Sequence, residues 1–154
     1  MPQALAARRA HPKLGPSRMS DSPAQILRDV SVIAVVGLSR DPSKAAHSVP
    51  AALQAAGFRI IPVNPEATEL LGEPCFPTLA AVPSPVDLVL VFRPARFAAA
   101  IAEQAVAIGA KALWLQLGIA SAEAREIAER AGLRYVENRC AAVERARFGI
   151  VKAR

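Results

Sequence analysis

The segment from Gly37 to Lys44, with the sequence GLSRDPSK, holds the side chains best suited to bind an anion. Gly37 allows the chain to turn sharply, while Ser39 and Ser43 carry hydroxyl groups. Lys44 adds a positive charge, and a helix that follows presents free N–H groups and the positive end of its dipole. These parts suit a phosphate or pyrophosphate, and the alternative is an ordinary turn with a solvated lysine. Because the segment follows the first predicted strand, we favour the phosphate.

The usual fingerprint of a dinucleotide-binding turn is absent, since Ser39 and Pro42 stand where further glycines are expected. Asn64 and Pro65 end the second predicted strand, where a NAD-binding protein places Asp or Glu against the ribose hydroxyls. Without a carboxylate there, a 2′- or 3′-phosphate on the ribose is not repelled. We therefore expect a phosphorylated nucleotide rather than NAD.

Further polar side chains follow the other predicted strands. Arg93 comes after the third strand and can reach a phosphate, whereas Gln116 comes after the fourth and can hydrogen-bond an amide group. Cys140 follows the fifth strand and is more simply a small buried residue than a nucleophile. Trp114 stands inside the fourth strand, so we expect it in the core.

The elements that must position these side chains are strands that alternate with helices. Short apolar runs predict strands over residues 32–36, 58–63, 88–91, 112–115 and 134–136. Capping residues and helical spacing predict helices over residues 22–29, 47–56, 94–108 and 121–131. The proline-rich stretch 64–87 is expected to be irregular, with one short helix after Thr78. The alternation predicts an α/β fold, a doubly wound, Rossmann-like, parallel five-stranded sheet in a single domain.

Composition limits the class of protein. A chain of 154 residues that is 53% hydrophobic fits one globular domain, which we place at residues 21–154 after a flexible tail at residues 1–20. No apolar run reaches about 18 residues, so we expect no membrane span. Cys75 and Cys140 have the spacing of neither a metal site nor a disulfide framework, so we expect a cytoplasmic location.

The net charge of +6 lies at the two ends of the chain. Residues 1–18 and residues 139–154 each carry +4, whereas residues 19–138 hold ten basic and twelve acidic side chains. Along residues 121–131, Glu and Arg alternate as they do on a solvated helix face. Because no basic stripe with interleaved aromatic residues exists, we expect no nucleic-acid partner.

Together these strand ends resemble the CoA-binding domain family, which includes the N-terminal domain of the succinyl-CoA synthetase alpha subunit. The similarity covers residues 22–150 and is closest to the small stand-alone bacterial members. It rests on six segments, namely VGLSRDPSK at 36–44, IPVNP at 61–65, LGEPCFP at 71–77, VFR at 91–93, WLQLG at 114–118 and NRC at 138–140. The last segment departs from the family's Asp-Arg-Cys at Asn138.

The resemblance implies a domain that binds coenzyme A or an acyl-CoA. The residues that it assigns to CoA fall into three groups, at the phosphates, beside the adenosine and along the pantetheine arm. In that order they are Gly37, Ser39, Lys44 and Ser48; Val63, Asn64 and Pro65; and Phe92, Arg93 and Gln116.

Candidates for catalysis are few. His11 falls in the tail, and His47 is most simply a polar residue at a helix start. We find no paired carboxylates at the predicted ligand edge and expect neither catalytic residues nor metal ligands, hence a binding protein rather than an enzyme. Two alternatives stay open, a NAD(P)-binding oxidoreductase and a subunit of a CoA ligase. The expected partner is a small CoA ligand, with a second copy of the chain or a ligase chain as protein partners.

Overall fold

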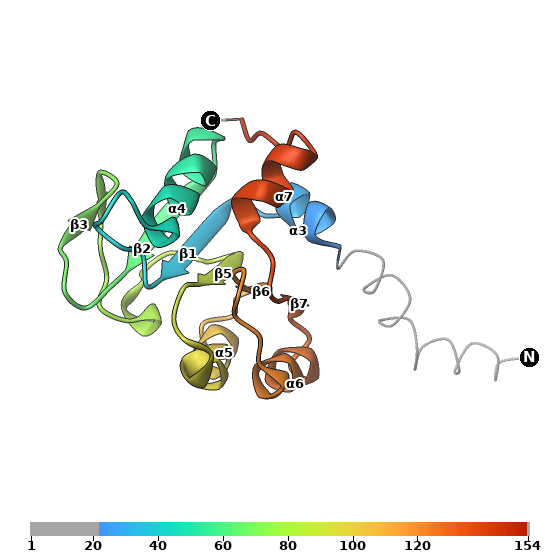
Figure 1. The fold of residues 1–154 in the computed structure, drawn as a ribbon. Helices are drawn as coiled ribbons and strands as arrows, with labels where there is room; N and C mark the ends of the chain where they lie inside the picture. The colour runs from blue at the N-terminus through green and yellow to red at the C-terminus, as the bar shows by residue number, and fades with distance from the viewer. Residues whose placement is uncertain (1–21, 154) are drawn as a thin grey trace, which may run out of the picture.

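The computed structural model describes residues 22–153, whose course is drawn in Figure 1. Five strands form one sheet in the order β2-β1-β5-β6-β7, and every pair of neighbours is parallel. They are β1 (Val32–Val36), β2 (Arg59–Val63), β5 (Leu88–Val91), β6 (Ala112–Leu115) and β7 (Arg134–Val136). The predicted doubly wound parallel sheet of five strands is confirmed.

Helices cover both faces of the sheet, as Figure 1 shows. One face carries α3 (Pro23–Asp29), α4 (Ala45–Ala55) and α7 (Ala141–Arg147), where α7 packs against the other two. The opposite face carries α5 (Ala98–Ala107) and α6 (Ala122–Arg130), which pack against each other. The chain therefore crosses to one face after β1 and to the other after β5, which makes the gap between these two neighbouring strands the topological switch point.

The strands are apolar on both sides because each side faces a helical layer. In β1, Ile33 and Val35 belong to the core beneath α3, α4 and α7, whereas Ala34 belongs to the core beneath α5 and α6. The same alternation places Leu90 in the first core and Val89 in the second. Continuous apolar runs, instead of alternating ones, are what a sheet buried on both faces requires.

Most elements lie within two residues of their predicted bounds, and the exceptions have physical reasons. Residues predicted to open a single helix at 94 first form a 3-10 turn, η2 (Ala95–Phe97). The ribbon of β3 (Glu69–Leu70) and β4 (Glu73–Pro74) was not predicted, because two-residue strands carry no periodic signal. Helix α7 was not predicted either, and its seven residues make only two turns.

The proline-rich stretch after β2 matches its prediction in part. Its one short helix, η1 (Leu79–Ala81), begins after Thr78, whose hydroxyl accepts a hydrogen bond from the Ala81 N–H. Phe76 forms a parallel bridge with Val63 and so extends the edge of the sheet beside β2.

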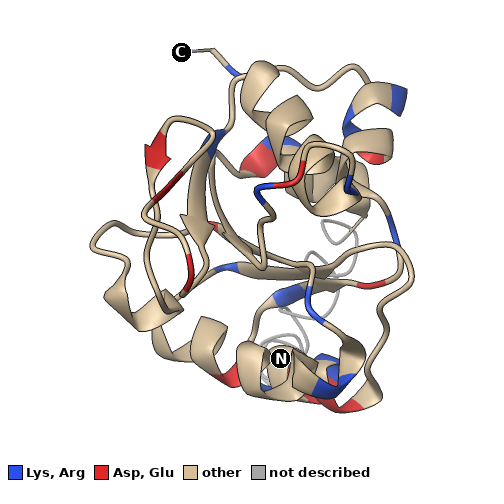
Figure 2. Cartoon of the chain, turned by 60° about the vertical axis from the view of Figure 1, so that its left-hand side comes forward, with Lys and Arg blue, Asp and Glu red and all other residues tan. Residues whose placement is uncertain are grey.

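Charged side chains of both signs are interspersed over the described chain, as Figure 2 shows. On α6 the predicted solvated face is confirmed, since Arg125 pairs with Glu129 and Arg130 with Glu126 at exposed positions. The tail expected at residues 1–20 lies outside the described residues. No helix among residues 22–153 is long and apolar enough to cross a membrane.

The last described residues close the amino-terminal end of the sheet. The Lys152 N–H donates to Ala56 O at 2.7 Å, and its ammonium group donates to Arg28 O. Gly57 lies directly beneath this contact with φ at +105°, and a β-carbon built there would lie 2.1 Å from Lys152 O. A glycine is therefore required at position 57 both for its backbone conformation and for the close approach of the C-terminal segment.

We predict that Gly57→Ala lowers the free energy of unfolding by about 2–5 kcal/mol, because it combines a left-handed backbone with a backbone clash. Gly109→Ala is the matched control, since Gly109 also follows a helix with positive φ but has open space around it. This control should lose only about 1–2 kcal/mol. Urea unfolding measures both changes, and equal losses would contradict the role given to the C-terminal segment.

Candidate functional site

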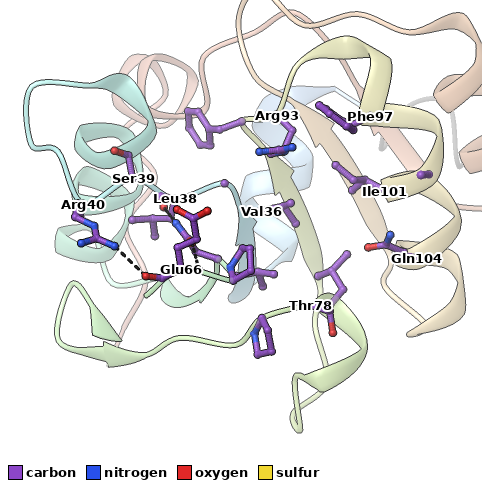
Figure 3. Close-up of a pocket in the computed structure, with 18 residues that line it drawn as sticks. Val36, Leu38, Ser39, Arg40, Glu66, Thr78, Arg93, Phe97, Ile101 and Gln104 are labelled. Atoms are coloured by element: carbon purple, nitrogen blue, oxygen red, sulfur yellow. Dashed lines mark hydrogen bonds between the residues drawn. The ribbon is translucent and has the colours of Figure 1, made fainter. Parts of the chain in front are cut away.

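A cleft of about 580 Å³ opens at the carboxyl ends of β2, β1 and β5. Figure 3 shows its walls, formed by the turn after β1, the loop after β2, the residues that follow β5 and one face of α5. This is the switch point of the doubly wound sheet, where the two crossovers leave a crevice between them. The topology therefore puts this cleft where a ligand is expected.

Seven of the ten residues predicted to contact a ligand line this cleft. They come from three separate strand ends and are Gly37, Ser39, Val63, Asn64, Pro65, Phe92 and Arg93.

The other three predicted residues do not line it. Lys44 is the exposed residue before α4, and Ser48 is exposed in the first turn of that helix. Gln116 is buried, and its side-chain oxygen accepts a hydrogen bond from the Ala141 N–H at 3.2 Å. Gln116 therefore hydrogen-bonds an amide as expected, but this amide is the backbone N–H of Ala141 at the start of α7.

The turn after β1 is braced by its own side chains. The Asp41 N–H donates to the Ser39 hydroxyl at 3.0 Å, and the Ser43 N–H and hydroxyl both donate to the Asp41 carboxylate. The Ser43 N–H and hydroxyl hold the pKa of Asp41 below its usual value, with smaller contributions from Lys44 and His47. The turn is therefore held in shape by its own side chains.

His47 contributes to the same brace. Its Nδ1 lies 2.7 Å from Ser39 O, so the ring ties the first turn of α4 back to the turn after β1. This contact gives His47 a structural part, in keeping with the polar helix-start residue expected from the sequence.

Asn64 joins the loop after β2 to the turn after β1. Its side-chain NH₂ donates to Leu38 O at 2.9 Å, and its side-chain oxygen accepts from the Glu66 N–H at 2.7 Å. Its backbone oxygen accepts from the Cys75 thiol, whose pKa is raised by burial. An aspartate at position 64 could accept from Glu66 but could not donate to Leu38, so the amide is required for the bridge.

Arg93 is held at the β5 end of the cleft. Gly37, with φ at +90°, lets the Arg93 side chain pass close by, since a β-carbon there would lie 3.3 Å from Arg93 Cδ. The Arg93 guanidinium lies 4.4 Å from the centre of the Phe97 ring, a cation–π contact that limits where its charge can move. A cation is thus held at the end of β5 beside the glycine turn.

The sequence prediction missed part of the lining. Phe97, Ile101 and Gln104 form the α5 wall, and their spacing of four and three residues is the helical signal that could have identified them. Arg40 and Glu66 also line the cleft. The expectation that this edge lacks a carboxylate is therefore wrong, because the loop after β2 turns Glu66 back toward the turn after β1.

A second hollow, of about 380 Å³, lies beside β7 and is lined by polar side chains. There the Tyr135 hydroxyl donates to Glu137 at 2.8 Å, and Arg125 lies over the Tyr135 ring and pairs with Glu137. Burial and the bond to Glu137 raise the pKa of Tyr135 well above its usual value. These groups satisfy one another, so we interpret them as a structural network that ties β7 to α6.

Two further predictions concern the core and metal binding. Trp114 is fully buried as predicted, and its ring N–H donates to Arg139 O at 2.8 Å. Among residues 22–153, no group of three or more His, Cys, Asp or Glu side chains is placed to hold a metal ion.

Comparison with known proteins gives one family and several relatives. The family described as CoA binding domain matches residues 31–146. The uncharacterized protein YneT of Bacillus subtilis is 36% identical over 79% of this chain and 90% of its own length. The acetate–CoA ligase (ADP-forming) I of Archaeoglobus fulgidus is 28% identical over 71% of this chain but only 17% of the ligase. The crystal structure of Prb, a protein redesigned for binding, superposes with a TM-score of 0.80 at 33% identity, over 84% of this chain and 92% of Prb.

We predict that Asn64→Asp lowers the free energy of unfolding by about 1–3 kcal/mol, because it removes the donor to Leu38 O and sets two acceptors against each other. Asn138→Asp is the matched control, since the Asn138 side chain accepts from the Gly118 N–H and a carboxylate can do the same. The control should change stability by less than about 1 kcal/mol. Urea unfolding at neutral pH compares the two, and an equal effect would contradict the bridge.

Proposed function

The chain belongs to the CoA binding domain family, and from that premise we propose that it binds coenzyme A or an acyl-CoA in the cleft at the ends of β2, β1 and β5. The observation that carries the proposal is the placement of Arg93 beside the glycine turn after β1, at the switch point of the sheet. A cation beside a glycine turn is an arrangement that suits a pyrophosphate group.

The shape and lining of the cleft support a nucleotide. Its volume of about 580 Å³ lies in the range of small-molecule sites, about 300–1,000 Å³. Val63, Pro65, Phe97 and Ile101 give it apolar walls against which an adenine ring can pack. We infer that the adenosine and its phosphates occupy the cleft and that the pantetheine arm extends out of it.

Three further residues enter the proposal, Ser48 through the family resemblance alone and Lys44 and Gln116 also through the chemistry of their side chains. Lys44 and Ser48 are retained as outer contacts of the phosphates, and Gln116 as a contact on the pantetheine side. None of the three lines the cleft, so we expect them to contribute less than Arg93.

One observation favours a second candidate, a NAD-binding oxidoreductase. Glu66 places a carboxylate at the end of β2, which is where dinucleotide-binding proteins hold ribose hydroxyls. A third candidate is a CoA-ligase subunit that depends on another chain. It is supported by the similarity to the acetate–CoA ligase, in which the matching region is a small part of the protein.

Calorimetric titration with CoA, dephospho-CoA, NAD and NADP tests the choice among these ligands. We expect CoA to bind more tightly than NAD, which lacks a ribose phosphate, and than NADP, whose phosphate is at the 2′ and not the 3′ position of the ribose. NAD binding as tight as CoA binding would favour the oxidoreductase and contradict the proposal. Absence of CoA binding would contradict it as well.

We predict that Arg93→Ala weakens CoA binding by about 1–3 kcal/mol, because a charge-assisted hydrogen bond to phosphate is lost. Lys44→Ala should weaken CoA binding by a similar amount only if the Lys44 ammonium group contacts a phosphate. We expect it to weaken CoA binding less than Arg93→Ala does. Lys111→Ala is the control, since this exposed lysine lies just before β6, at the opposite end of the sheet. An Arg93→Ala variant that binds CoA as tightly as the Lys111→Ala variant would remove Arg93 from the site.

A further inference from the structure

We propose that Arg40 makes the cleft prefer a ligand whose ribose carries a phosphate, and that Glu66 limits this preference. The inference rests on the proposed function and names the residues that would set its specificity at the β2 end of the cleft. It starts from two side chains that the structure brings together although they come from different strand ends.

Arg40 spans the gap between these strand ends. It leaves the turn after β1, and its guanidinium donates to the backbone oxygen of Glu66 in the loop after β2 at 2.9 Å. Both residues line the cleft, and Figure 3 shows the Arg40 side chain reaching toward this loop. Arg40 donates from the β1 turn to the β2 loop, and Asn64 donates from the β2 loop to the β1 turn. These two hydrogen bonds hold the Arg40 guanidinium at the rim of the cleft.

The contact leaves most of the guanidinium available to a ligand. Arginine has five N–H donors in a planar fork, and the Glu66 carbonyl oxygen accepts from one of the terminal nitrogens. Because Arg40 is exposed, its remaining donors face the cleft rim or solvent instead of the core. A side chain already restrained by one hydrogen bond loses less conformational freedom when it binds an anion, so it is well suited to a phosphate.

The charges of the cleft are divided between its two ends. Among the described residues that line it, the cations are Arg40 at the β2 end and Arg93 at the β5 end, and the carboxylate is Glu66. Gly37 and Phe97 restrain Arg93, so the Arg93 guanidinium cannot take the place of Arg40 at the β2 end. A ligand with two separate phosphate groups matches this division, whereas a ligand with free ribose hydroxyls would need Glu66 and not Arg40.

Glu66 acts against the phosphate at the same corner. Its backbone oxygen holds Arg40 and its side chain belongs to the lining of the same cleft, so a phosphate bound by the guanidinium would share the cleft with a negative charge. Like charges at short range disfavour binding, while a neutral amide of the same shape would not. The preference for a phosphorylated ribose is therefore set by the balance of Arg40 and Glu66.

The test is the ratio of the Kd values for dephospho-CoA and CoA, measured by calorimetry on the unaltered protein and on variants. We expect CoA to bind at least about tenfold more tightly than dephospho-CoA in the unaltered protein. Arg40→Gln should bring this ratio close to one while changing the dephospho-CoA affinity less than about threefold, and Glu66→Gln should raise the ratio several-fold. Arg40→Lys, which keeps the charge but not the fork, should give an intermediate ratio.

Arg96→Gln is the control, because Arg96 is an exposed arginine like Arg40 and contacts the lining residue Phe97, but does not itself line the cleft. Its ratio should equal that of the unaltered protein. A purely structural role of Arg40 would weaken both ligands equally and leave the ratio unchanged, and that result would overturn the inference while the proposed function stands. Failure of the unaltered protein to bind either ligand would overturn both.

Discussion

The hydrogen bonds of the Asn64 side chain are the interaction on which the site depends. By donating to Leu38 O and accepting from the Glu66 N–H, this one amide fixes the loop after β2 against the turn after β1. The β1 turn is itself braced by Asp41 and His47, so the cleft has a rigid wall on this side. Together with the hydrogen bond from Arg40 to Glu66 O, this bridge fixes where Arg40 and Glu66 lie at the β2 end of the cleft.

The fold supplies the rest of the site through its connections. Because β1 lies between β2 and β5, the ends of three strands far apart in the sequence meet at one edge. The helices that follow β1 and β5 lie on opposite faces, which opens the crevice between them. Arg93 reaches this crevice over Gly37, where any larger residue would crowd its side chain. The anion binding that we propose for the cleft thus depends on one glycine and two arginines.

The sequence predicted the sheet and seven of the residues that line the cleft, because these depend on local patterns and on one topological rule. Apolar runs locate the strands, and residues directly after them, such as Asn64 and Arg93, must meet at the carboxyl edge. The Glu66 carboxylate was missed because its position depends on how an irregular loop turns back. The packing of Gln116 against the start of α7 could not be predicted either, since that helix itself has too few residues to show a pattern.

The most direct test of the account is to map backbone amide chemical shifts while CoA is added to the isotopically labelled protein. Binding in the cleft predicts the largest shift changes in the amides of residues 37–40, 63, 64, 66, 92, 93 and 97, which line three of its sides. Residues 134–139, beside the polar hollow at β7, should change little. Shift changes concentrated at this hollow, or none at saturating CoA, would contradict the assignment of the cleft as the CoA site.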